Sequence, residues 1–146
     1  MPIVSALYHL ALAFWTGGVA LFTFVLTPAL FRTGPRDLAA RVVGILFPGY
    51  FRWGLGCGAI ALVCRLVARG AGADPALFLL LLLLALVLFQ AFFIEPRAAA
   101  LKEEIASFEA TPRDHPLRRR FSRLHAVSAL CNLIVFGGGV VLILLG

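Results

Sequence analysis

Four long apolar stretches dominate this chain, and each is long enough to cross a lipid bilayer as a helix. They extend over residues 3–31, 42–66, 75–94 and 121–145. Of the 146 residues, 62% are hydrophobic and 14% are charged, whereas an ordinary soluble domain is about 25% charged. We therefore predict an all-α membrane protein, a single domain over residues 1–146 with four transmembrane helices in an antiparallel bundle. The pattern excludes a disulfide scaffold, a disordered chain and a water-soluble enzyme.

Local signals mark where some of these helices begin or break. Asp74 followed by Pro75 predicts an N-cap and a first helical residue, so the third helix starts there. Pro48 lies inside the second stretch and is expected to end or kink a helix.

The one sizeable polar segment, residues 95–120, separates the third and fourth stretches. Its first half predicts an amphipathic helix with Ala98, Leu101, Ile105 and Phe108 on one face and Lys102 away from that face. This helix either lies on the membrane surface or extends the third span. The segment 111–116 then breaks it.

Basic residues predict the orientation in the membrane. Arg65 and Arg69 are the two basic residues on one side, and ten lie on the side of connections 32–41 and 95–120. Cytoplasmic connections accumulate Lys and Arg, so both connections are expected in the cytoplasm and both termini outside the cell membrane. The ten are Arg32, Arg36, Arg41, Arg97, Lys102, Arg113, Arg118, Arg119, Arg120 and Arg123.

Polar side chains inside spans are candidates for function, because they are costly in lipid and usually face the bundle interior. On the first span, His9, Thr16, Thr23 and Thr27 share one helical face. The alternative is that the threonines bond to their own backbone and that His9 is satisfied by a neighbouring hydroxyl.

A second polar face lies on the fourth span, where His125, Ser128 and Asn132 follow one another at steps of three and four. We predict that His125 lies near Arg52, Glu95 and Tyr50 at the cytoplasmic end. Two interpretations are open: a structural ion pair between Arg52 and Glu95, or a polar mouth whose histidine titrates near neutral pH. Asn132 could also simply join two helices by a hydrogen bond.

Cysteines and histidines raise the question of metals and haem. Cys57 and Cys131 fall near mid-membrane on different helices and could hold a soft cation in transit, or be ordinary buried thiols. His9 and His125 are separated along the membrane normal by roughly 20 Å at 1.5 Å per residue, so they cannot ligate one haem together. Cys57, Cys131, His9 and His125 are the tentative candidates for metal ligands.

Small and basic residues predict contacts rather than chemistry. Gly54, Gly58 and the run Gly137, Gly138, Gly139 would let helices approach closely, within one bundle or between protomers of a homo-oligomer. The basic cluster 118–123 is expected to attract anionic lipid headgroups rather than nucleic acid.

Several motifs lie along nearly the whole chain: His9 with Trp15 and Gly17-Gly18, the segments 28–31 and 46–50, and 120–125 leading to Ser128 and Asn132. Together they resemble the transmembrane protein 205-like family of small four-helix proteins, whose bacterial members are of unknown function. More distantly, the layout is similar to the copper resistance D proteins, some of which handle haem. The resemblance implies a role in heavy-metal or drug resistance.

Three functions follow as hypotheses. The first is a protein that transports or handles a metal ion or another small solute. His9 and the threonine face with Thr16 and Thr23 would form an external approach and Cys57 and Cys131 the midpoint. Arg52, Glu95, His125 and Asn132 would form the cytoplasmic mouth. The second is a haem-associated redox or haem-handling protein. The third is a structural or accessory subunit.

Overall fold

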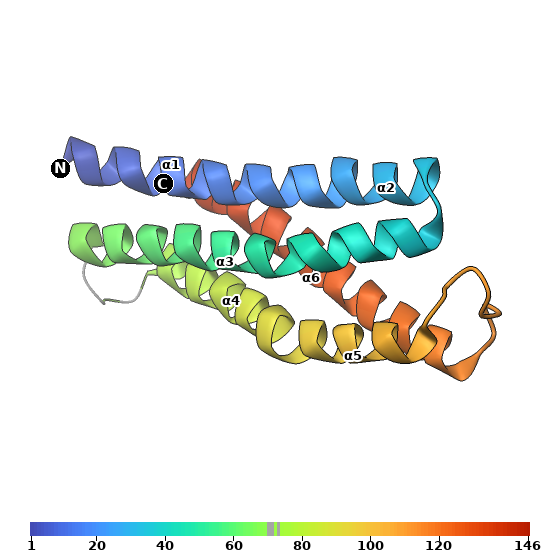
Figure 1. Ribbon diagram of the computed structural model, residues 1–146. Helices are drawn as coiled ribbons and strands as arrows, with labels where there is room; N and C mark the ends of the chain where they lie inside the picture. The colour runs from blue at the N-terminus through green and yellow to red at the C-terminus, as the bar shows by residue number, and fades with distance from the viewer. Residues whose placement is uncertain (70–71, 73) are drawn as a thin grey trace.

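The computed structural model describes residues 1–69, 72 and 74–146, and within them the fold is four long helical rods (Figure 1). The first rod comprises α1 (Pro2–Ala20), η1 (Leu21–Leu26) and α2 (Thr27–Thr33), and the second is α3 (Arg36–Arg69). The third comprises α4 (Pro75–Phe89), η2 (Gln90–Ile94) and α5 (Glu95–Ile105), and the fourth is α6 (Pro116–Leu145). All four are long and apolar enough to cross a membrane, which confirms the predicted all-α membrane fold.

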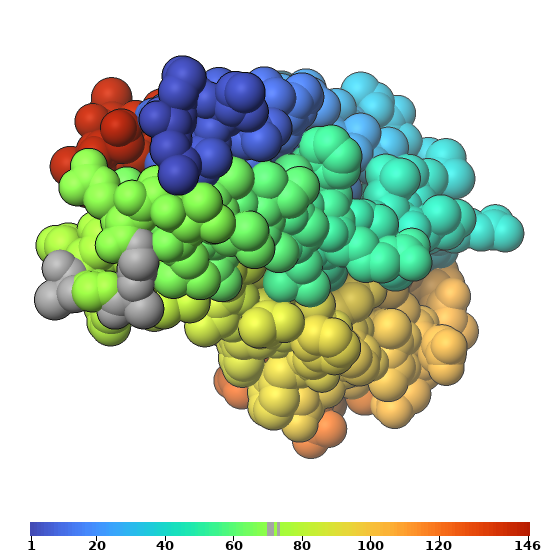
Figure 2. Space-filling model, turned by 90° about the vertical axis from the view of Figure 1, so that its left-hand side faces the viewer, coloured from blue at the N-terminus to red at the C-terminus, as the bar shows by residue number. Residues whose placement is uncertain are grey.

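The rods form a bundle in which α1 and α4 each pack against both α3 and α6. As a result, α3 and α6 lie diagonally opposite each other in the bundle. The end with the connections at 34–35 and 106–115 is called the loop end here, and the opposite end, with both chain termini, the terminal end (Figure 1). Figure 2 looks onto the terminal end, where the start of α1 packs over the last turns of α3 and beside the end of α6.

Two of the rods contain a π-helical turn, and each turn directly precedes an X-Pro step. The backbone N–H of Thr27, before Pro28, bonds to Phe22 O. That of Glu95, before Pro96, bonds to Gln90 O. A proline ring clashes with the carbonyl four residues earlier, and the wider turn makes room for it without breaking the rod. Each rod therefore continues as a helix past its proline.

Pro48 does not end the helix of the second rod, so that part of the prediction is wrong: α3 is one helix of 34 residues with Pro48 inside it. A proline within a helix costs about 3 kcal/mol. Packing beside it offsets this cost. Phe47 and Phe51 are buried on one face and stack with ring centroids 5.6 Å apart.

At the loop end, α5 continues the third rod rather than lying apart from it, which decides between the two predicted placements. The helix ends at Ile105, so Phe108 is not on its apolar face as predicted. Ala106 adopts a positive φ of 55°. Asp37 then holds the connection by accepting bonds from Ser107 Oγ (2.7 Å) and Phe108 N (2.5 Å).

At the terminal end, Asp74 caps α4 as predicted, because its Oδ1 accepts from Ala76 N at 3.1 Å. Its carboxylate also receives Nε and Nη2 of Arg65, at 2.6 and 2.9 Å. Arg65 lies over the Tyr8 ring, 5.7 Å from its centroid. Inward of this pair the bundle is filled by an apolar layer of wholly buried side chains: Leu12, Ala61, Leu80, Leu83 and Leu142.

Candidate functional site

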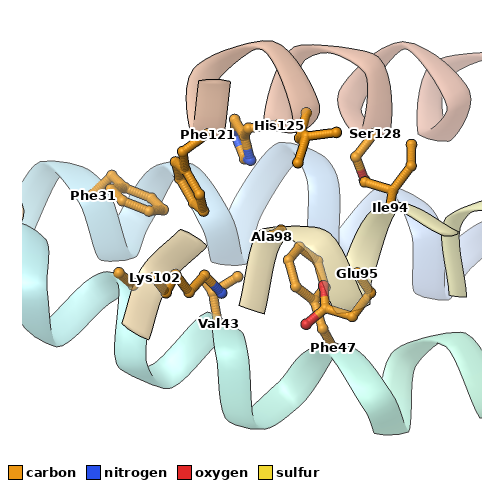
Figure 3. A pocket seen from close by; sticks show the side chains of 12 residues that line it. Phe31, Val43, Phe47, Ile94, Glu95, Ala98, Lys102, Phe121, His125 and Ser128 are labelled. Carbon is orange, nitrogen blue, oxygen red and sulfur yellow. The ribbon is translucent and has the colours of Figure 1, made fainter. Parts of the chain in front are cut away.

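The loop half of the bundle contains a small cavity of about 20 Å³, called the Lys102 cavity, whose mostly apolar wall includes four charged or polar side chains. Lys102 and Glu95 extend into it from α5, and His125 and Ser128 from α6 (Figure 3). Its volume suits one water molecule or a solute of similar size. The remaining walls are Phe31, Ala40, Val43, Phe47, Ile94, Ala98, Phe121 and Leu124.

The Lys102 amine is the most unusual group in this cavity. Its Nζ is buried and has no hydrogen-bond partner within the described part of the chain. The ring centroids of Phe47 and Phe121 lie 5.7 and 5.8 Å away, which allows weak cation–π attraction on two sides. Glu95 lines the same cavity without forming an ion pair with Lys102, since Arg65–Asp74 is the single ion pair among the described residues. A buried ammonium is therefore left without a direct counter-ion.

His125 forms the rim of the Lys102 cavity. Its ring stacks on Phe121 with centroids 6.3 Å apart and lies 6.4 Å from that of Phe31. The side chain remains exposed on its outer edge. His125 is thus placed between the cavity and the outside of the bundle.

A second, central cavity of about 10 Å³ lies deeper in the bundle. The wall between the two cavities is a buried hydrogen bond of 2.8 Å from Ser128 Oγ to Gln90 Oε1. Ser128 lines the Lys102 cavity and Gln90 lines the central one. Gln90 Nε2 and Trp15 Nε1, both from residues lining the central cavity, are buried without a partner among the described residues.

Across the central cavity, Tyr50 OH donates to Asn132 Oδ1 over 3.2 Å. This bond joins α3 to α6, the two helices on the diagonal. Two predicted residues, Ser128 and Asn132, therefore line successive cavities. Both are buried and both hydrogen-bond to another rod.

Arg52, which was predicted to meet Glu95 and His125, lies elsewhere. It is exposed, its Nε bonds to Pro48 O at 3.2 Å, and it borders an outer hollow between α1 and α3. Tyr50 and Arg52 are two residues apart, and residues at that spacing point to different sides of a helix. Since Tyr50 points inward, Arg52 points outward, and Lys102 is the basic residue beside Glu95.

The polar residues of the first rod are spread along it. His9 is near the terminal end, where its Nδ1 bonds to Ser5 O at 2.8 Å. Thr16 is buried, and Thr23 Oγ1 is buried without a partner among the described residues. His9 and His125 thus lie towards opposite ends of the bundle.

The cysteines are free and buried. Cys57 borders the outer hollow between α1 and α3, and Cys131 is on α6, across the diagonal from α3. No three His, Cys, Asp or Glu side chains in the described residues are grouped so that they could hold one metal ion.

Most of the predicted packing glycines lie against large side chains of another rod. A Cβ on Gly54 would meet Trp15 Nε1 at 3.1 Å, and one on Gly58 would meet Leu84 and Trp15. Likewise Gly138 lies against Leu83 and Gly139 against Thr16. Gly137 has open space around it. Close approach within the bundle thus needs four of these five glycines.

Lys102 and Gln90 were missed as site residues, although the sequence carries a signal for each. Lys102 lies four residues after Ala98 and three before Ile105, both of which are buried, so it shares their face. Gln90 is the amide within the third apolar stretch, where an uncharged polar side chain needs a partner. Lys102 was instead assigned to the polar face of the predicted helix.

These features define a small multispan membrane protein with a polar interior at one end. Its chain belongs to the family described as Domain of unknown function (DUF4149), whose model matches residues 10–107. The match covers most of the first rod, from residue 10 on, and all of the second and third rods, and it ends before α6, so it includes Lys102, Glu95 and Gln90. No solved structure gives a significant match to the chain. Similarity to the transmembrane protein 205-like and copper resistance D families stays a prediction.

Proposed function

We propose that this protein is a carrier that binds a small polar solute between its helices and moves it across the membrane. The observation that supports this most directly is the succession of two small cavities with polar side chains in their walls at the loop half, followed by a layer of wholly buried apolar side chains at the terminal half. A polar path that stops at an apolar barrier is what one state of a carrier looks like. An open channel would need a continuous lumen.

The direction of access follows from charge. Ten basic residues lie around the loop end, and such residues accumulate on the cytoplasmic side. We therefore propose that the Lys102 cavity faces the cytoplasm of a cell with this protein in its inner membrane. His125, at the rim, would be the first interior side chain that a solute meets.

A liposome swelling assay tests the carrier proposal. Proteoliposomes are mixed with isosmotic glycerol, glycine or potassium chloride, the last with valinomycin to carry the potassium. Entry of any of these solutes faster than into protein-free liposomes, and its loss in Gln90→Leu, is the expected result. Arg52→Gln serves as the matched control because Arg52 lies outside both cavities. Equal rates with and without protein for all three solutes would overturn the proposal.

A structural or accessory subunit is the second candidate, and the two interhelical hydrogen bonds favour it. Tyr50–Asn132 and Ser128–Gln90 each join different rods, which is what polar residues do when their task is assembly. Under this alternative, Asn132→Ala reduces the amount of folded protein in the membrane. It leaves solute entry per folded molecule unchanged.

A further inference from the structure

The unpartnered polar groups of the residues that line the two cavities have a common chemical character. Lys102 Nζ, Gln90 Nε2 and Trp15 Nε1 are all buried N–H groups without a partner among the described residues. Each can donate a hydrogen bond and none can accept one. The interior of the loop half therefore has a surplus of donors, which calls for an acceptor.

From this surplus we infer that the solute is a small monovalent anion, held first at Lys102 and then in the central cavity between Gln90 and Trp15. This inference rests on the proposed carrier function and names the class of its solute. Water can satisfy the two neutral donors, but it does not neutralise a buried ammonium, and a buried charge is stable only when paired. An anion supplies both the acceptor and the counter-charge.

The size of the cavities limits which anion fits. At about 20 Å³ the Lys102 cavity has room for one occupant near the size of water, and at about 10 Å³ the central cavity lies at the lower limit for a single water. Chloride, a single atom, is close to this size, and formate, with three heavy atoms, is larger. Gluconate carries the same charge and is too large for either cavity.

Charges around the Lys102 cavity have to be weighed together. Of the residues that line this cavity, Lys102 and Glu95 come from α5 and His125 from α6, while those from α2 and α3 are uncharged. The Glu95 carboxylate opposes an anion and competes with it for Lys102. Removing that charge should therefore strengthen anion binding, which is the reverse of what a cation site would show.

A wider hollow of about 160 Å³ adjoins the Lys102 cavity and shares Phe31, Ala40 and Phe121 with it. Arg36 and Arg118 line this hollow together with Ser122. Nη1 of Arg118 is already bonded to Phe108 O and Thr111 O, so it is held in place. The loop end as a whole carries ten basic and six acidic residues, and this positive excess would draw anions towards the hollow.

Binding is measured as the thermal unfolding midpoint of the detergent-purified protein against rising sodium chloride or sodium formate, with sodium gluconate keeping the ionic strength constant. A ligand that binds the folded state raises the midpoint. We expect a rise with chloride or formate. The apparent Kd should rise at least tenfold in Lys102→Met, fall several-fold in Glu95→Gln and stay unchanged in Arg52→Gln. Met fills the space of the lysine stem without its charge, so this variant should fold.

The outcomes separate this inference from the proposal on which it rests. The inference that the solute is an anion is wrong if Glu95→Gln binds chloride and formate more weakly than the unaltered protein. It is also wrong if Lys102→Met binds them with the same affinity as the unaltered protein. If glycerol or glycine enters proteoliposomes while chloride does not enter and neither chloride nor formate binds, the anion inference is wrong and the carrier proposal stands. If no solute binds or enters, both fail.

Discussion

Tyr50 on α3 and Asn132 on α6 are joined by a hydrogen bond of 3.2 Å across the diagonal of the bundle. Hydrogen bonds between transmembrane helices contribute on average about 0.6 kcal/mol and at most about 1.7 kcal/mol. Tyr50→Phe should therefore lower the free energy of unfolding in mixed micelles by an amount in that range. A double-mutant cycle with Asn132→Ala isolates the bond, and full additivity of the two changes would show that the pair does not interact.

For the buried hydrogen bond between Ser128 and Gln90, removing one partner should destabilise the protein more than removing both. Ser128→Ala leaves the Gln90 carbonyl oxygen buried and unpaired, at a cost of about 1–3 kcal/mol of unfolding free energy. The double variant Ser128→Ala with Gln90→Leu removes both polar groups and should regain most of that loss. Denaturant titration of the three proteins measures this, and a double variant as unstable as Ser128→Ala would contradict it.

Gly58 and Gly137 provide a matched pair for testing how tightly the rods pack. An added methyl at Gly58 collides with Leu84 and Trp15, so Gly58→Ala should destabilise by about 1–3 kcal/mol. Gly137 meets nothing within 4 Å, and Gly137→Ala should be neutral or stabilising by up to about 1 kcal/mol, since alanine favours the helix. Unfolding midpoints that order the two variants in the opposite way would refute the packing described here.

The Arg65–Asp74 ion pair predicts how stability responds to acid. The bond from Arg65 lowers the pKa of Asp74 to about 2, from an ordinary value of 3.8. A carboxylate with a lowered pKa stabilises the fold above its unfolded-state pKa and loses that contribution as the pH falls towards the folded-state value. The pair should therefore stabilise the protein fully above about pH 4 and progressively less towards pH 2.

Asp74→Asn tests the ion pair separately from the helix cap, because asparagine caps a helix as well as aspartate does. Its unfolding midpoint should be lower than that of the unaltered protein at pH 6, and the difference should shrink towards pH 2. Asp74→Ala loses the cap as well and should be less stable than Asp74→Asn throughout. A constant difference between Asp74→Asn and the unaltered protein over this pH range would exclude the ion pair as its cause.

Ala106 is strained at the end of α5, with φ 55° and ψ −51°. Positive φ costs a residue with a Cβ about 1–2 kcal/mol, and glycine avoids this cost. Part of the gain is lost because glycine is more flexible in the unfolded chain. Ala106→Gly should thus raise the unfolding free energy by up to about 1 kcal/mol, measured by denaturant titration. A fall in stability would show that Ala106 is not strained.

The four rods could be predicted from the sequence because length and hydropathy alone determine which segments can cross a bilayer. The path inside them was predicted in part. Ser128 and Asn132 stand in a regular α-helix, so their spacing gave their common face correctly. Lys102 was placed on a polar outer face, because a lysine in a charged segment is usually solvated. Only the packing of α5 against α3 and α6 decides that its amine is buried.

Gln90 escaped prediction for a different reason. It begins the π-helical turn, and the partner it needs, Ser128, is 38 residues away on another rod. Hydrophobic periodicity describes one helix at a time and carries no information about which amide meets which hydroxyl. The same limit explains why Tyr50 was expected near His125 instead of bonded to Asn132.

The π-helical turn at Gln90–Ile94 makes the site sensitive to the exact length of the third rod. Each residue of an α-helix advances the chain by about 100° around the axis. A π turn corresponds to one residue more than the regular helix needs, so loss of one residue from this segment could restore an ordinary α-helix and keep the span hydrophobic. It would also swing Glu95 and Lys102 by about 100° out of their cavity. Chains that differ here by a single deletion could therefore share the membrane fold while lacking the interior charge.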